Sequence, residues 1–244
     1  MSDTPPADPP PRDPVPAYLS YYPEVLASGS LRGALQEAAD RAGLPLAVEL
    51  TSAPGWRVVA AQVTADGRAA QVLMSIGDRS FSVTCWAADV SMATGRTEEL
   101  SEVVGALHSW MRGHRLRELV AQWPFLRTWE LAEAYERGDA VPARWRSLRG
   151  SAEQRGDTAM GELLRAAFAE PRLRVLSPGQ SMQWLTFSRG AAPPICRDLP
   201  RTMPVKGGGY RIRFADGRLQ DAEDAAGAVA IVLAGLPEDA VPHP

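Results

Sequence analysis

The sequence predicts an α+β protein with two helix-flanked antiparallel sheets, in the outline of a pseudo-repeat, joined by a helical segment. One amphipathic helical pattern is followed by four strand-like runs with short turn signals between them. Helix, strands and helix recur near the C-terminus, after a long helical stretch. Short connections favour antiparallel pairing. We therefore expect a tail at 1–16, an N-terminal unit at 17–112, a helical connector at 113–150 and a C-terminal unit at 151–240.

The tail mixes proline with aspartate and has no apolar periodicity. Such a segment buries too little surface to offset its loss of conformational entropy, so we expect it to be disordered.

The N-terminal unit begins with the helical stretch SLRGALQEAADRAG, in which Ser30 is a plausible N-cap and Gly43 a C-terminal stop. A helix that Thr97 can cap closes the unit. Between them, Cys85 shares a strand face with apolar residues, which predicts a core position rather than a reactive thiol. The four strand-like runs are LAVELT, WRVVAAQVT, AAQVLMSI and SFSVTCWA.

The connector reads as wholly helical, with aromatic residues among arginines. Arginine beside aromatic residues can stack on nucleobases. From Arg112 to Arg149, however, eight arginines face five acids, and Glu130, Glu133 and Glu136 lie among the aromatics. Carboxylates there would repel a phosphate backbone, so helix packing is the favoured interpretation.

The C-terminal unit is expected to hold a helix at about 158–169, the strands LRVL, MQWLTFS and YRIRF, and a helix through DAEDAAGAVAIVLAG. In two of these strands arginines alternate with apolar residues, which predicts one arginine-rich sheet face. The residues expected on that face are Arg172, Arg174, Arg211 and Arg213. Residues 172–213 contain seven arginines and Lys206 against the single acid Asp198.

Two interpretations of this face stay open. The arginines bind an anionic ligand or an acidic partner, with Trp184 and Ser188 as further contacts. Alternatively, they form a solvated face that Asp221, Glu223 and Asp224 partly neutralise.

Candidates for catalysis are weaker. Cys196 lies in a proline-rich loop next to Arg197, which can lower the pKa of its thiol. Asp198 and His108 are the candidate acid–base groups. His108 and His114 have no third ligand at a metal-like spacing, so we expect no metal site and no cofactor.

The totals exclude few functions. A net charge of −3 gives no reason to expect nucleic acid or membrane binding. Two cysteines are too few for a disulfide framework, and no signal peptide is evident at the N-terminus. No apolar run approaches the roughly 20 residues that span a bilayer. These features predict a cytoplasmic protein.

Three stretches carry a family resemblance: WPFLRTWELAEAYERGDAVPARWRSLR, EPRLRVLSPGQSMQWLTFSRG and GGGYRIRFADGRLQDAEDAAGAVAIVLAGLP. From about Leu107 onward the chain resembles an uncharacterised bacterial family, common in actinobacteria, whose members are labelled natural-product biosynthesis proteins with a domain of unknown function. Many members carry a Ser-Arg-Cys element where this chain has Ser188, Arg189 and Gly190. The resemblance implies a specialised-metabolite setting and transfers no catalytic residue.

Three functions follow as hypotheses. The first is an accessory protein of such a pathway that binds a small or carrier-tethered anionic molecule on the arginine-rich face. The second is a cofactor-independent cyclase or isomerase. The third is a protein-binding module, such as an immunity or regulatory partner.

Overall fold

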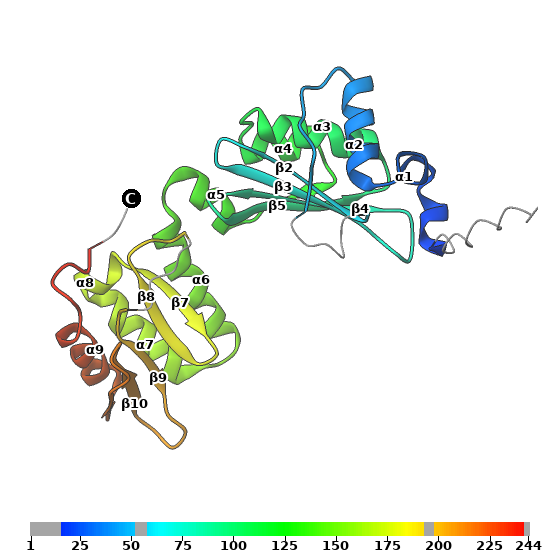
Figure 1. Ribbon diagram of the computed structural model, residues 1–244. Helices are drawn as coiled ribbons and strands as arrows, with labels where there is room; N and C mark the ends of the chain where they lie inside the picture. Colours follow the sequence, from blue (N-terminus) through cyan, green and yellow to red (C-terminus); the bar gives the residue numbers. More distant parts are fainter. Residues whose placement is uncertain (1–15, 52–57, 193–197, 242–244) are drawn as a thin grey trace, which may run out of the picture. The chain divides into compact units, whose positions relative to one another are not determined.

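A computed structural model describes residues 16–51, 58–192 and 198–241 (Figure 1). The expected disordered tail lies almost wholly outside the described residues. The chain divides into two compact units, one of Met1–Thr84 with Gly95–His114 and one of Cys85–Thr94 with Arg115–Pro244. Helices and two antiparallel sheets make up both units, so the expected α+β class is confirmed.

The first sheet has six strands in consecutive order: β1 (Glu49–Leu50), β2 (Ala60–Ala65), β3 (Arg68–Met74), β4 (Phe81–Ala87), β5 (Val90–Thr97) and β6 (Leu126–Arg127). The β2–β3 turn has positive φ at Asp66 (48°) and Gly67 (75°), as a two-residue hairpin turn requires. Cys85 on β4 is fully buried, as expected. β5 and β6 were missed, because their residues alternate weakly or lie in a helical context.

The helices of the first unit are η1 (Ala17–Tyr21), α1 (Pro23–Ser28), α2 (Leu31–Arg41) and α3 (Leu100–Met111). The hydroxyl of Ser30 accepts a hydrogen bond from the Gly33 N–H at 3.1 Å, which confirms the predicted N-cap. Both α2 and α3 contact β2. Trp110 of α3 donates from Nε1 to the Ala69 carbonyl at 3.0 Å, which ties the helix to β3.

The expectation that residues 113–150 are wholly helical is wrong in detail. The structure has α4 (Leu116–Gln122), β6, α5 (Glu130–Arg137) and α6 (Ala140–Gln154). Pro124 follows α4, and Gly138 takes a left-handed conformation (φ 79°) after α5. These two residues break the helical run for local steric reasons.

The second unit continues with α7 (Thr158–Ala169), α8 (Pro171–Arg174), β7 (Ser177–Ser181), β8 (Trp184–Ser188), β9 (Arg201–Pro204), β10 (Tyr210–Arg213), β11 (Leu219–Ala222) and α9 (Ala225–Ala234). The second sheet is again consecutive, in the order β11-β10-β9-β8-β7. It has two strands more than the three expected. Pro178 is tolerated in β7 because that strand is at the sheet edge.

The predicted strand LRVL is wrong, because most of it belongs to helix α8 and its end. Pro171 starts the helix, where its missing N–H costs nothing, and the Arg174 N–H bonds the Glu170 carbonyl at 2.9 Å. Leu173 and Leu176, three residues apart, are both fully buried. Val175, which was expected to share the face of Leu173, is 46% exposed.

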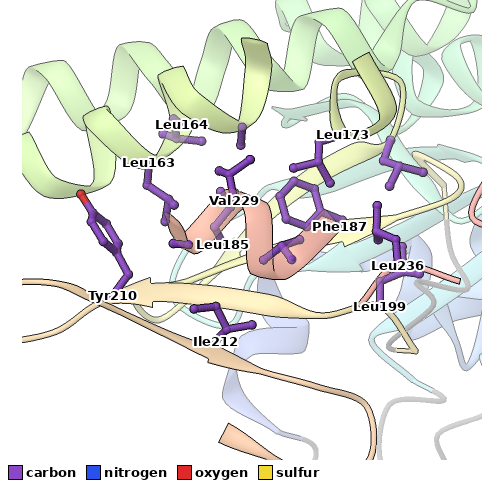
Figure 2. Packing of buried hydrophobic residues seen from close by; sticks show 14 of the residues in the cluster. Leu163, Leu164, Leu173, Leu185, Phe187, Leu199, Tyr210, Ile212, Val229 and Leu236 are labelled. Carbon is purple, nitrogen blue, oxygen red and sulfur yellow. The ribbon is translucent and has the colours of Figure 1, made fainter. Parts of the chain in front are cut away.

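One face of the second sheet packs against helices. Figure 2 shows Leu163 and Leu164 of α7 and Val229 of α9 around Leu185, Phe187 and Ile212 of the strands. Trp145 of α6 joins this core, and its Nε1 donates to the carbonyls of Arg174 (3.0 Å) and Leu176 (3.2 Å). The opposite face of the sheet carries both polar and apolar side chains.

Candidate functional site

The face of the second sheet that points away from the core is called the outer face here. Tyr210 and Ile212 of β10 are buried in the core, so Arg211 and Arg213 lie on the outer face, as alternation predicted. The side chains that share it are Trp184, Thr186, Arg201, Met203, Arg211, Arg213, Leu219 and Asp221. Each of these is half-buried or exposed.

Arg213 has two direct neighbours in the sheet. It is paired with Arg201 on β9 and with Leu219 on β11. Among the described residues, neither Arg201 nor Arg213 is within ion-pair distance of a carboxylate. Directly opposite like charges on neighbouring strands repel and lower the stability of a sheet. The register therefore places two arginines directly opposite each other, neither of which has a carboxylate partner among the described residues.

Trp184 lies beside this pair. The guanidinium carbon of Arg201 is 5.0 Å from the centroid of the Trp184 ring. A cation over an indole face is attracted by the ring, which limits the rotamers of Arg201. An aromatic surface therefore borders the positive charge.

Arg211 is already neutralised. Its Nε and Nη2 atoms donate to the two carboxylate oxygens of Asp221 at 2.8 and 2.9 Å. The hydrogen bonds from Arg211 hold the pKa of Asp221 below its usual range. The expected neutralisation by Asp221 is thus found at Arg211.

Arg172 and Arg174 are not on the outer face, because they belong to α8. Arg174 lies over the Phe168 ring of α7 at 5.8 Å, and Arg172 donates weakly to the Pro237 carbonyl at 3.4 Å. The four arginines predicted from the sequence therefore do not come together. Of the predicted arginines, only Arg213 lies on the outer face without a carboxylate partner in the described chain. Arg201, which was not predicted, lies opposite Arg213 and over the Trp184 ring.

A known protein family matches the part of the chain that contains this sheet. Residues 139–243 match a family of unknown function (DUF6193). The match runs from the start of α6 past α9, so it contains the entire second sheet and its core. Searches against curated proteins and against solved structures found no match.

Ser188, a predicted contact in the DUF6193 region, is only 4% exposed. It is paired with Ser177 across the β7–β8 ladder. Among the described residues, its hydroxyl has no hydrogen-bond partner. Its burial separates it from the half-exposed side chain of Trp184 on the same strand.

Asp198 is held in an ion pair. Its Oδ2 is 2.5 Å from Nη1 of Arg189, a residue that is only 7% exposed. The hydrogen bond from Arg189 keeps the pKa of Asp198 below its usual value. A carboxylate stabilised in its charged form is a poor proton donor near neutral pH, so this geometry favours a structural role.

The other catalytic candidates are His108 and Cys196. His108 is half-buried on α3 of the first unit, and Cys196 lies outside the described residues. Within residues 16–51, 58–192 and 198–241, no three His, Cys, Asp or Glu side chains are grouped so that they could hold a metal ion. No helix in the same stretches is long and apolar enough to cross a membrane.

Sequence reasoning missed Arg201, because Pro200 and Pro204 flank it and demote the segment as a strand. Pro204 closes β9 opposite Tyr210, and the pairing of Thr202 with Ile212 fixes which face Arg201 occupies. Only the register of β9 against β10 reveals the arginine pair.

Proposed function

We propose that this chain is a cytoplasmic accessory protein of bacterial specialised-metabolite biosynthesis, which binds a small or carrier-tethered anionic molecule on the outer face. The observation that carries the binding proposal is the cross-strand pair of Arg201 and Arg213. The pathway and the cellular setting rest on the sequence resemblance alone.

An anion between the two guanidinium groups would relieve their repulsion and accept hydrogen bonds from both. Guanidinium groups present several N–H donors in a planar fork, a geometry that matches carboxylate and phosphate oxygens. Arg211 contributes less, because Asp221 already occupies its donors. The proposed anion site therefore contains fewer arginines than the four that the sequence predicted.

The organic part of the ligand would lie over the apolar side chains that border the pair. Trp184 offers a half-exposed ring, Met203 a half-exposed thioether, and Leu219 is 54% exposed. Aromatic and thioether side chains make favourable contacts with flat organic groups. This combination supports an anion attached to an apolar or aromatic body rather than a free inorganic ion.

The test uses phenyl phosphate and benzoate as probes, with binding followed by NMR of the tryptophan indole N–H signals. We expect the Trp184 signal to shift on titration and the shift to be lost in the double variant Arg201→Gln, Arg213→Gln. Arg172→Gln is the control, because Arg172 is exposed like Arg213 but lies on α8. No shift with either probe, or an equal shift in the double variant, would overturn the proposal.

Native mass spectrometry of the protein purified from its own host gives the identity of the ligand. An extra mass that is present in the native state, absent after denaturation and lost in the double variant would give the size of the bound molecule.

An acidic protein partner is the second candidate. The half-buried and exposed side chains of the outer face come from four strands, β8 to β11, which suits a broad surface, and Met182 at the tip of the β7–β8 hairpin is 92% exposed. A partner that co-purifies at low salt, dissociates at high salt and is lost in the double variant would favour this candidate. The cyclase or isomerase alternative stays a prediction without an assigned catalytic group.

A further inference from the structure

A pocket of about 280 Å³ lies between α6 and α7, well separated in sequence from the strands of the outer face. Its lining comes from Arg149, Ala152, Glu153, Gly156, Asp157, Thr158, Gly161 and Arg165. The contributions of α6 follow a three- and four-residue spacing, and so do those of α7, so each helix offers one face to the pocket. This volume is at the lower end for small-molecule sites.

The two arginines of the pocket come from different helices. Arg149 is half-buried, and its guanidinium carbon lies 4.5 Å from the centroid of the Phe168 ring, which positions it. Within the described residues, neither Arg149 nor Arg165 forms an ion pair with a carboxylate. Both therefore have donors that a bound anion can use.

The two carboxylates of the pocket, those of Asp157 and Glu153, differ in their hydrogen bonding. Asp157 caps α7, where its Oδ1 accepts from the Met160 N–H at 3.1 Å. Glu153 is exposed, and its carboxylate has no hydrogen-bond or ion-pair partner within the described chain. The pocket thus combines two available cations with one available carboxylate.

The uncharged lining residues of the pocket leave space for a ligand beside the charged side chains. Ala152 is 1% exposed and belongs to the core of the unit, so it forms an apolar floor. Gly156 and Gly161 present no side chain, and a Cβ atom built on either would have no neighbour within 4 Å. A ligand can therefore approach the backbone of both glycines.

We propose that this pocket binds a small zwitterion of the amino-acid type, with its carboxylate between Arg149 and Arg165 and its ammonium group at Glu153. A simple anion would leave the Glu153 carboxylate without a partner, whereas a zwitterion would pair with Arg149, Arg165 and Glu153 together. The side chain of the ligand lies over Ala152 in the space that Gly161 leaves. This site is distinct from the outer face, and the two proposals stand or fall separately.

The probes are the common L-amino acids, screened by NMR of the Gly156 and Gly161 backbone amides and then titrated by calorimetry. Leucine is compared with 4-methylpentanoate, which lacks the ammonium group, and with isoamylamine, which lacks the carboxylate. We expect at least one amino acid to bind and its two single-charge analogues to bind at least about tenfold more weakly.

Variants assign the charges. Arg149→Gln and Arg165→Gln should each weaken binding of the amino acid by about tenfold or more. Glu153→Gln should weaken binding of the amino acid in the same way, but it should not weaken binding of the carboxylate analogue. Gly161→Leu should block all binding, whereas Gly150→Leu, an open α6 position outside the pocket, should not. The melting temperature of each variant confirms that it folds.

Failure of every amino acid to shift the two glycine amides would overturn the proposal. Equal binding of leucine and 4-methylpentanoate, with no effect of Glu153→Gln, would also overturn it, because the pocket would then recognise only an anion. Neither result would affect the phenyl phosphate test of the outer face.

Discussion

Arg201 and Arg213 occupy directly opposite positions on the neighbouring strands β9 and β10, with no carboxylate of the described chain within ion-pair distance of either. Opposite positions of a sheet place side chains within contact distance, so the arrangement costs stability unless something compensates the charge. Arg211 is the other arginine of β10 on the same face, and an ion pair with Asp221 compensates its charge. Arg211 therefore has a structural role in the sheet, whereas the donors of Arg213 are available to a binding partner.

Replacing Arg213 with glutamate should stabilise the protein. The new carboxylate would lie opposite Arg201 and convert repulsion into attraction, which raises the free energy of unfolding by about 0.5 kcal/mol. Urea unfolding of Arg213→Glu and of the exposed control Arg172→Gln measures the effect. A lower free energy of unfolding for Arg213→Glu than for the wild type would show that the two guanidinium groups do not repel in the folded state.

The stability of the fold should depend on pH through the ionisation of Asp198. Arg189 lowers the pKa of Asp198 below its usual value near 3.8, so the pair stabilises the fold above that pH. Its contribution is lost as the pH falls through the lowered pKa. Because the Asp198 side chain is 51% exposed, we expect Asp198→Asn to cost only about 1 kcal/mol at pH 7.

Denaturant unfolding of the wild type and of Asp198→Asn from pH 7 down to pH 2 tests this dependence. The difference between the two curves should shrink as the pH falls and Asp198 takes up a proton. A constant difference across the range would mean that the asparagine acts through packing rather than through charge.

The indole N–H of Trp145 should contribute to the stability of the second unit. Trp145 is 1% exposed, and its Nε1 donates to the carbonyls that end α8. Trp145→Phe removes the donor and part of the buried ring, at a cost of about 2 kcal/mol. Trp129→Phe is the control, because Trp129 is 37% exposed and its loss should change little. Equal effects of the two substitutions on thermal unfolding would contradict this role.

Tyr22 should stabilise the first unit through its hydroxyl. The side chain is fully buried, and the hydroxyl accepts from the Ser80 N–H at 2.9 Å while its single proton can be donated to the Asp78 carbonyl at 2.8 Å. Tyr22→Phe leaves a buried N–H without its acceptor, which costs about 1 to 2 kcal/mol. Tyr21→Phe, at a 45% exposed neighbour, should be neutral. Amide hydrogen exchange at Ser80 reports the change locally, and unaltered protection there would refute it.

Local patterns predicted those features that depend on neighbours in sequence. The alternation of Tyr210 and Ile212 with the two arginines of β10 gave the correct face for each, because side chains of a strand alternate with a period of two. The same logic failed at residues 173–176. Leu173 and Leu176 fit a helical spacing, whereas Leu173 and Val175 fit a strand, and a run this short does not distinguish the two.

The candidate site was predicted only in part. Arg213 and Trp184 lie on one face as expected, but Arg172 and Arg174 were assigned to a strand that does not exist. Arg201 was hidden because its flanking prolines argued against a strand, although Pro200 lies just before β9 and Pro204 is its last residue, so neither lies in the middle of the strand.

The sequence by itself determined the α+β class, most of the helices, the first hairpins and the alternation along β10, since each depends on periodicity, capping or turn residues within a few positions. Only the tertiary structure decided that β9 pairs with β10 so that Arg201 meets Arg213, and that α6 and α7 enclose Arg149 and Arg165. Both arrangements bring together residues from separate elements. Their positions are set by strand register and core packing, which burial of the whole apolar surface decides and no local pattern records.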